Sequence, residues 1–265
     1  MKISTVNVNG IRAAARKGMH EWLSSEDPDV VLMQEVRADA GIASDLLGEQ
    51  WQTVSVPCRI KGRAGVLIAA RSGRARVLET REVLDGIETD VDSGRWVEAV
   101  IEAGGRRVRV VSAYFHSGEK DTPKQDAKMA HLPRIGARLS ELLASGEDVV
   151  VAGDFNIVRS RIDIKNWTPN HNKRAGVLDE EIAFLEEWIA SGWRDVVRDL
   201  AGEVQGPYSW WSQRGKAFDN DTGWRIDYQF ATPGLAERAQ GFSIARAASY
   251  DARFSDHAPV SVVYA

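Results

Sequence analysis

The stretch VVVAGDFN at residues 149–156 decides the fold class of this 265-residue chain. Its first four residues, Val149–Ala152, are apolar and mostly β-branched, which predicts a short buried strand. The strand runs directly into Gly153, Asp154 and Asn156, polar or small residues that a hydrophobic core does not need. Buried strands of this kind, separated by helical segments, are typical of α/β proteins.

The same pattern recurs on both sides of this stretch. Apolar or alternating runs predict further strands at residues 2–8, 29–33, 51–56, 65–70, 96–101, 108–113, 226–231 and 260–264. Apolar residues at three-to-four spacing predict helices over residues 11–25, over 123–145, and around Ile182, Leu185, Trp188 and Ile189. Gly104-Gly105 predicts a hairpin turn, and Pro133 should kink or restart the second helix. Because hairpins and βα units occur together, the sheets should be mixed.

Composition places the chain among ordinary globular proteins. It is 43% hydrophobic and 27% charged, and we find no repeat or low-complexity linker. The single cysteine, Cys58, excludes an intramolecular disulfide and every multi-cysteine zinc site. No run approaches eighteen apolar residues, so we expect no membrane span or membrane partner. The N-terminus reads as a strand without an apolar signal core, which favours a cytoplasmic protein.

The net charge of −4 at first argues against a nucleic-acid partner. The charge is unevenly distributed, however. Two segments are strongly basic: residues 59–81 hold Arg59, Lys61, Arg63, Arg71, Arg74, Arg76 and Arg81, and residues 159–174 hold Arg159, Arg161, Lys165, Lys173 and Arg174. Such segments suit contacts with a nucleic-acid backbone, which predicts binding that weakens steeply with salt. A solvated surface is the alternative for either segment.

Polar residues that a core does not require follow four of the predicted strands and precede a fifth. They are Asn7 and Asn9, Gln34-Glu35, Tyr114, Asp154 and Asn156, and the segment Ser255–Pro259 before the last strand. Ligands of α/β proteins bind at strand ends, so we expect a shared site there. Each residue also has a structural alternative: Asp154 and Asn156 suit an Asx turn, Asp256 suits a turn cap, and a lone histidine is more often structural.

The sequence narrows the chemistry of such a site. It contains no HExxH pair, no GxSxG elbow and no GxxxxGK[ST] loop, which disfavours catalytic zinc, a serine nucleophile and a P-loop. What remains is carboxylates, amides, one tyrosine and one histidine. Carboxylate and amide oxygens suit a hard cation such as Mg²⁺. With a positioned carboxylate and histidine, such a cation forms a centre for phosphoester hydrolysis.

In their order along the chain, these motifs resemble the endonuclease/exonuclease/phosphatase superfamily. The residues that carry the resemblance are Asn7, Gln34-Glu35, Tyr114, Gly153-Asp154-Phe155-Asn156, Arg225-Ile226-Asp227 and Ser255-Asp256-His257-Ala258-Pro259. More narrowly, the set is similar to exonuclease III-type apurinic/apyrimidinic endonucleases. The resemblance implies a single catalytic domain over residues 1–265. It also implies a DNase I-like fold, a four-layer α/β sandwich with two mixed β-sheets flanked by helices.

The resemblance also implies a role for each site residue. Glu35, with Asn7 and Asp256, would hold Mg²⁺, with Mn²⁺ as the other candidate. Asp154 would orient or deprotonate the attacking water, and Asn156 would hold the water or the phosphate. His257, paired with Asp227, would contact the scissile phosphate together with Tyr114. Lys128 would assist at the phosphate. The loop after the tyrosine more often carries a proline in related proteins, whereas here it reads Tyr114-Phe115-His116-Ser117-Gly118, which leaves the rigidity of that loop open.

A second segment implies the substrate. Residues 208–212 and 223–227 are similar to the part of the repair enzymes that takes a base-less deoxyribose, so Trp210, Trp224 and Ile226 would line an apolar pocket, with Arg174 among the DNA contacts. Trp211 would point inward, into the core. The expected partner is duplex DNA with abasic sites or blocked 3′ ends, bound by a monomer in the bacterial cytosol or nucleoid. The expected activity is Mg²⁺-dependent hydrolysis 5′ to the abasic site, with 3′→5′ exonuclease and 3′-phosphatase activity. Another phosphoesterase of this fold and an inactive nucleic-acid-binding regulator are the alternatives.

Overall fold

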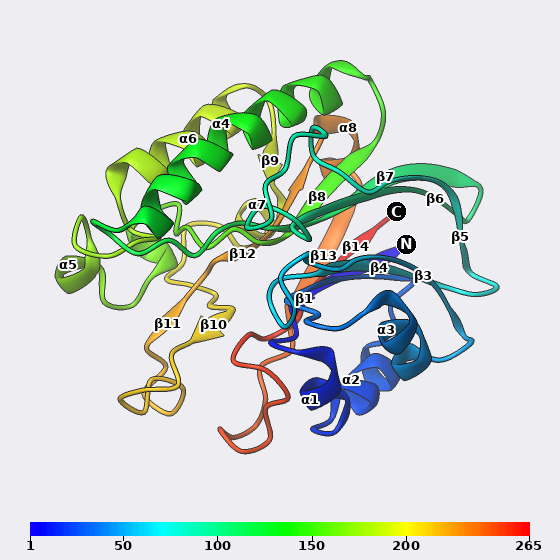
Figure 1. Ribbon diagram of the computed structural model, residues 1–265, viewed down its shortest axis with the longest axis horizontal. Coiled ribbons are helices and arrows are strands. Elements are labelled where there is room, and N and C mark those ends of the chain that lie inside the picture. Colours follow the sequence, from blue (N-terminus) through cyan, green and yellow to red (C-terminus); the bar gives the residue numbers. More distant parts are fainter.

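Two six-stranded sheets stack face to face in the computed structural model, which describes all residues from 1 to 265 (Figure 1). The first sheet has the order β13-β14-β1-β2-β4-β3. It comprises β1 (Lys2–Asn7), β2 (Val30–Gln34), β3 (Trp51–Val56), β4 (Val66–Arg71), β13 (Ala239–Ile244) and β14 (Val260–Tyr264). The second has the order β5-β6-β7-β8-β12-β9. It comprises β5 (Ala75–Arg81), β6 (Trp96–Ala103), β7 (Arg106–Tyr114), β8 (Val149–Asp154), β9 (Arg194–Asp195) and β12 (Asp227–Ala231).

Helices cover the outer face of each sheet, which completes four layers (Figure 1). The first sheet is covered by α1 (Ile11–Ala15), α2 (Met19–Glu26) and α3 (Ala40–Leu47), and the second by α4 (Pro123–Ala144) and α6 (Asp179–Ala190). The short helices are α5 (Trp167–Asn170), α7 (Val196–Ala201) and α8 (Pro233–Ala236). The predicted α/β sandwich with two mixed sheets is confirmed: β1–β2 and β7–β8 pair in parallel, and the other neighbours are antiparallel.

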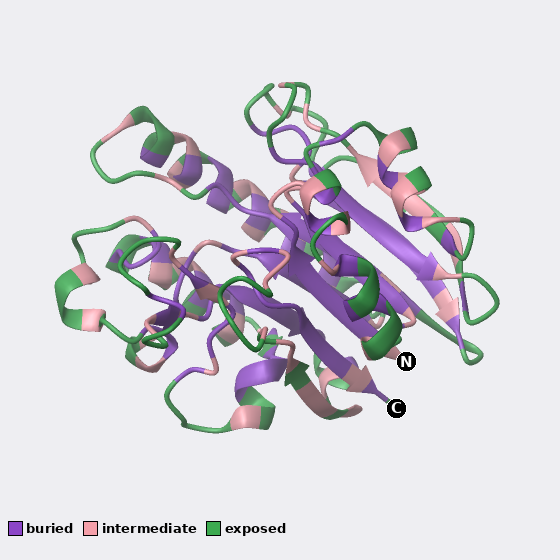
Figure 2. Cartoon of the chain, turned by 90° about the horizontal axis from the view of Figure 1, so that it is seen from below, coloured by how far each residue is buried: buried purple, intermediate pink, exposed green.

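The strands are buried because the sheets share a core and the helices add one on each outer face. The central core holds 24 buried residues, among them Ile3, Val66 and Val110. Figure 2 shows the strands as the continuous buried part of the chain, with exposed residues in the loops and on outer helix faces. This explains why β2 and β8 read as unbroken apolar runs, whereas the edge strand β5 carries exposed polar residues and escaped prediction.

The strand register gathers the polar strand ends. Asn7 at the end of β1 lies beside Gln34 of β2, and Tyr114 at the end of β7 lies beside Asp154 of β8. The antiparallel strand β12 then brings Asp227 beside Asp154. Residues far apart in the sequence therefore meet at one rim of the stacked sheets.

Two expectations about helices are wrong. Residues 11–25 form two helices rather than one, because Gly18, with φ 108°, lies between α1 and α2 in a conformation that no helix interior accepts. Residues 123–144 form one continuous helix, α4, despite Pro133. Pro133 lies on the exposed face of α4, where water can reach the backbone carbonyl that the proline leaves without its usual partner.

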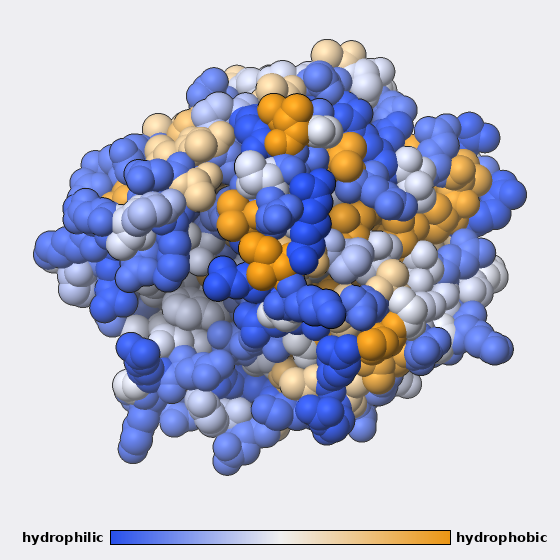
Figure 3. Space-filling model, in the orientation of Figure 1, coloured by the Kyte–Doolittle hydropathy of each residue, from blue (hydrophilic) through white to orange (hydrophobic).

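None of the helices has the length and apolarity that a membrane crossing requires. The face seen in Figure 3 is mainly hydrophilic, and hydrophilic residues separate its apolar patches.

Candidate active site

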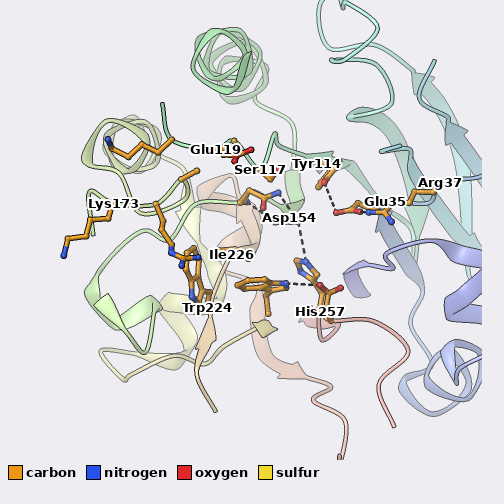
Figure 4. Close-up of a pocket in the computed structure, with 17 residues that line it drawn as sticks. Glu35, Arg37, Tyr114, Ser117, Glu119, Asp154, Lys173, Trp224, Ile226 and His257 are labelled. Carbon is orange, nitrogen blue, oxygen red and sulfur yellow. Dashed lines mark hydrogen bonds and ion pairs between the residues drawn. The ribbon is translucent and has the colours of Figure 1, made fainter. Parts of the chain in front are cut away.

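A cavity of about 620 Å³ opens at the rim where the polar strand ends meet. Glu35 and Tyr114 lie on one side of it, and Trp224 and Ile226 lie on the opposite side, with His257 between the two groups (Figure 4). The cavity therefore has an acidic side built by the sheets and an apolar side built by the segment around β10 (Trp210–Trp211) and β11 (Gly223–Trp224).

Asn7 joins two carboxylates on the acidic side. Its buried amide nitrogen donates to Glu35 Oε1 and to Asp154 Oδ2, each at 2.9 Å. The Tyr114 hydroxyl donates to the same Glu35 Oε1 at 2.7 Å. Neutral donors thus orient both carboxylates, and Arg37 pairs with Glu35 in addition.

The backbone around the rim adopts conformations that only a constrained site retains. Glu35 has φ 50° and Asn156 has φ 53°, both in the left-handed region. Asn156 is fixed by its backbone N–H, which donates to Asp154 Oδ1 at 2.9 Å. Gly153 is required sterically, because a Cβ there would lie 1.9 Å from the carbonyl oxygen of Ala113. The strand can therefore deliver Asp154 to the rim only with glycine before it.

His257 lies between two buried aspartates. Its Nδ1 lies 2.8 Å from Asp227 Oδ2, and its Nε2 lies 3.7 Å from Asp154 Oδ2. Burial alone would lower the pKa of His257, but the negative charges of Asp227 and Asp154 outweigh burial and raise the pKa, so the imidazole is held as a cation. Burial, with the charges of Asp227 and Glu35, raises the pKa of Asp154, against the opposing effect of His257.

Asp256 is held by two side chains from other segments. Asn9 Nδ2 donates to its Oδ1 at 2.9 Å, and the Trp210 indole N–H donates to its Oδ2 at 3.2 Å. Burial opposes ionisation of Asp256, but its pKa is lowered because the charge of His257 and these two donors favour the carboxylate.

Trp210, Trp224 and Ile226, the three residues to which the resemblance gives an apolar pocket, line the apolar side of the cavity. The two indole rings meet edge to face, with centroids 5.5 Å apart. Trp211, the next residue, is buried in a separate cluster with Tyr208 and Phe218, as expected for an inward residue. Arg174 and Lys173 also line the cavity and bring positive charge to its rim.

The expectation that Lys128 assists at the phosphate is wrong. Its side chain is 1% exposed and does not line the cavity. Its Nζ lies 2.8 Å from Glu181 and donates to the carbonyl oxygen of Asn156 at 2.9 Å. Because α4 buries Lys128 against Glu181 of α6, the side chain is not placed to contact a phosphate and instead supports the loop that carries Asn156.

The first basic segment, residues 59–81, is also only partly available. Arg71 and Arg74 pair with Asp27, Arg76 pairs with Glu102, and Arg81 donates to the backbone carbonyls of Val83 and Leu84. None of these four lines the cavity. In the second segment, Arg159 pairs with Glu186, and Lys173 and Arg174 reach the cavity. Counting basic residues along a sequence does not reveal these ion pairs.

The sequence analysis did not find Arg37, which pairs with Glu35, and it gave no role to the strand-end residue Asn9, which holds Asp256. Each lies within three residues of a predicted site residue, and that proximity was the available signal. His116, which lies in the proline-free loop after Tyr114, answers the question of loop rigidity. It is buried, and its Nε2 lies 2.8 Å from Asp92, which Arg134 contacts in turn at 2.9 Å. A hydrogen-bonded anchor therefore fixes this loop.

The donor set fits a hard divalent cation. Asp154, Asp227 and His257 form a group of possible ligands with donor atoms within 4.8 Å of one another. The Nδ1 of His257 is already paired with Asp227, however. Glu35, Asp256 and the amide oxygen of Asn7 offer oxygen atoms of the type that Mg²⁺ prefers. Four carboxylates face one imidazolium and Arg37, so the cluster carries excess negative charge that a cation would balance.

Comparison with known proteins agrees with this geometry. The model of the endonuclease/exonuclease/phosphatase family matches residues 4–257. The chain belongs to this family. It is 30% identical over 264 residues to an exodeoxyribonuclease of Bacillus subtilis, covering 99% of both chains. It is 27% identical to exodeoxyribonuclease III of Haemophilus influenzae, covering 98% of both chains.

Solved structures agree on the fold. An AP endonuclease from Archaeoglobus fulgidus superposes with a TM-score of 0.83 at 26% identity, covering 100% of this chain and 99% of that one. A 3′ phosphatase from Neisseria, bound to a product DNA hairpin, superposes with a TM-score of 0.86 at 24% identity over 100% and 99% of the two chains. Members of this family are metal-dependent hydrolases of phosphoesters, which is the chemistry that the carboxylate and histidine cluster suits.

Proposed function

We propose that this protein is a Mg²⁺-dependent DNA repair nuclease that hydrolyses the phosphodiester 5′ to abasic sites in duplex DNA, with 3′→5′ exonuclease and 3′-phosphatase activity. One observation carries the proposal: a single cavity joins the carboxylate and histidine cluster to an apolar pocket of Trp210, Trp224 and Ile226. If a DNA phosphate binds on the acidic side of this cavity, the sugar next to that phosphate would lie against the indole rings of Trp210 and Trp224. A deoxyribose without a base presents the compact, weakly polar surface that such a wall accommodates.

The proposed roles follow from the hydrogen bonds. Asp154, whose pKa is raised, is the group to accept a proton from the attacking water. His257, held as a cation by Asp227, donates to a phosphate oxygen through Nε2. Tyr114 and Asn156 add neutral donors at the same side. Negative charge grows on the phosphoryl oxygens during in-line displacement, and fixed donors stabilise it.

Glu35, Asp256 and Asn7 are the residues that would hold the cation, with Mg²⁺ proposed and Mn²⁺ as the other candidate. When bound, the cation supplies Lewis-acid stabilisation of the phosphate. The chain itself supplies the oxygen donors, the buried surroundings and the neutral hydrogen bonds that orient them.

We propose that Lys173 and Arg174 at the cavity rim contact the DNA backbone. Lysine and arginine in such positions set the register of a duplex without reading its sequence. Duplex DNA with abasic sites or blocked 3′ ends is the proposed substrate; similar proteins include a DNA-(apurinic or apyrimidinic site) endonuclease of Dictyostelium discoideum and exodeoxyribonuclease III of Haemophilus influenzae. The proposed active form is a monomeric single domain in the cytoplasm.

The test is incision of a duplex with one internal tetrahydrofuran abasic analogue, in Mg²⁺ and in EDTA, with the intact duplex as control. We expect cleavage of the abasic duplex in Mg²⁺ alone. No incision with Mg²⁺, or equal incision in EDTA, contradicts the proposal. If the duplex is bound but never cut, the chain is a nucleic-acid-binding regulator. If only small phosphate esters are hydrolysed, it is another phosphoesterase of this fold.

A further inference from the structure

The apolar wall of the cavity and the acidic loop at residues 255–258 are fastened together by backbone hydrogen bonds. Trp211 N–H donates to the carbonyl of Asp256 at 3.2 Å, and Ala258 N–H donates to the carbonyl of Ser209 at 2.7 Å. Trp210 and His257 face each other in an antiparallel bridge. Residues 209–211, which belong to the apolar wall, are thus paired through their backbone with residues 256–258 on the acidic side.

The wall is tied to the second sheet as well. The Ser209 hydroxyl accepts from the backbone N–H of Ile226 at 3.3 Å and of Asp227 at 3.1 Å. These hydrogen bonds connect Asp227, the partner of His257, to the segment that forms the apolar wall. The wall therefore cannot shift without shifting Asp227 and Asp256.

The side chain of Trp210 links the apolar wall directly to the carboxylate of Asp256. The indole N–H of Trp210 donates to Asp256 Oδ2 at 3.2 Å, and the ring face of the same residue lines the pocket. Trp224 forms the other half of the wall, yet its indole N–H has no hydrogen-bond partner in the protein. Both tryptophans therefore line the pocket, but only Trp210 donates a hydrogen bond to a carboxylate.

We infer that Trp210 is a positioning residue with two functions: its ring forms the wall for the base-less sugar, and its N–H orients Asp256 for the divalent cation. One side chain therefore serves both the pocket and the cation site. The assignment of Asp256 to the cation rests on the proposed function. Asn9 is the second holder of Asp256, so loss of the Trp210 bond loosens the carboxylate without freeing it entirely.

The test compares W210F with W224F. Both substitutions replace an indole with a smaller aromatic ring, but only W210F removes a hydrogen bond to a carboxylate. Mn²⁺ binding to the full chain, measured by titration calorimetry without DNA, should weaken roughly 3- to 10-fold in W210F, the range expected for the net loss of one ordinary hydrogen bond while Asn9 still holds Asp256. In W224F the Kd should stay within about twofold of the wild type.

Incision supplies a second readout, and excess metal should rescue W210F. The Mn²⁺ concentration for half-maximal incision of the abasic duplex should rise in W210F, and it should rise further in N9A/W210F, which loses both side chains that hold Asp256. Equal Mn²⁺ affinity in W210F and wild type, or equal weakening in W210F and W224F, overturns the inference. If wild type binds Mn²⁺ but cuts no abasic duplex, the proposed function fails, and a calorimetric difference between W210F and W224F still supports the positioning role.

Discussion

Two clusters of largely buried charge lie near β12, which pairs with β8 on one edge and with β9 on the other, and the clusters differ in how their charge is balanced. In the scaffold cluster, formed by Asp163, Asp195, Arg198 and Arg225, every carboxylate meets a guanidinium. Arg225 lies 2.5 Å from Asp163 and 2.8 Å from Asp195, and Arg198 lies 2.7 Å from Asp163. In the rim cluster, formed by Glu35, Asp154, Asp227, Asp256 and His257, carboxylates outnumber cations.

The pKa directions show what this difference means. Burial opposes ionisation of Asp163, but Arg225 and Arg198 lower its pKa below the usual range. Asp154 is buried to a similar extent, yet its pKa is raised, because burial adds to the charges of Asp227 and Glu35. Burial alone therefore does not mark a functional site. The mark is buried charge that the chain leaves unbalanced.

Removing the proposed base should have the largest effect. D154N keeps the shape of the side chain but cannot accept the proton, so incision of an abasic duplex should slow by about 10³-fold or more. DNA affinity should remain, and the free energy of unfolding in EDTA should not fall, because one uncompensated charge is gone. Single-turnover kinetics, a gel-shift assay and urea unfolding measure the three. A rate near that of the wild type refutes the role of Asp154.

The scaffold cluster should respond in the opposite way. R225M leaves two buried carboxylates short of a partner, so the free energy of unfolding should fall by about 3–5 kcal/mol. R76M removes an exposed arginine from Glu102 and should cost under about 1 kcal/mol. Urea unfolding of both variants provides the comparison. If R225M and R76M lose equally little free energy of unfolding, the buried pairing in the scaffold cluster stabilises the fold no more than an exposed ion pair does.

A third buried group, His131, tests charge balance through pH. Burial chiefly, with the nearby charge of His116, lowers the pKa of His131 to about 3. An unfolded chain binds a proton at this histidine below pH ~6.5, whereas the folded chain does not until about pH 3. Stability is therefore lost as pH falls through this window, by about 2 kcal/mol between pH 7 and pH 5.

In H131L this loss should disappear from the pH dependence of the unfolding free energy. H20L, at an exposed position, is the matched control and should leave the dependence unchanged. A curve for H131L that parallels that of the wild type would show that His131 is protonated in the folded protein.

The smallest expected effect concerns the rim arginine and lysine. K173A/R174A should reduce DNA affinity about 10-fold and flatten the dependence of affinity on salt by about two phosphate contacts. R76Q, which lies outside the cavity and is already paired, should leave both unchanged. Fluorescence anisotropy across a salt series measures the slopes. Identical slopes in all three proteins would place the DNA elsewhere.

Much of the fold could be predicted because its strands are buried on both faces. β3 and β14 have the bounds that their apolar runs predict, whereas the edge strand β5 and the short strands β9, β10 and β11 carry no such signal. The break between α1 and α2 depends on the conformation of Gly18, and the continuity of α4 depends on the exposure of Pro133. Both are properties of tertiary structure.

For the site, the residue types at the strand ends predicted a cation and phosphoester chemistry, and the pocket came from resemblance. What the sequence could not supply was pairing. Lys128 is neutralised by Glu181, Arg74 by Asp27, and Trp210 is bonded to Asp256, each across more than forty residues of sequence. Such long-range partners decide which charges remain available to a substrate.

The chemistry of the cut ends tests the central claim most directly. A duplex with a natural abasic site is cleaved in Mg²⁺, and the product is offered to a DNA polymerase without further processing. Hydrolysis by the rim cluster predicts a cut on the 5′ side that leaves an extendable 3′-hydroxyl, and no cut in EDTA. A cut on the 3′ side that persists in EDTA and leaves a blocked 3′ end would mean elimination by an amine, and would contradict the account.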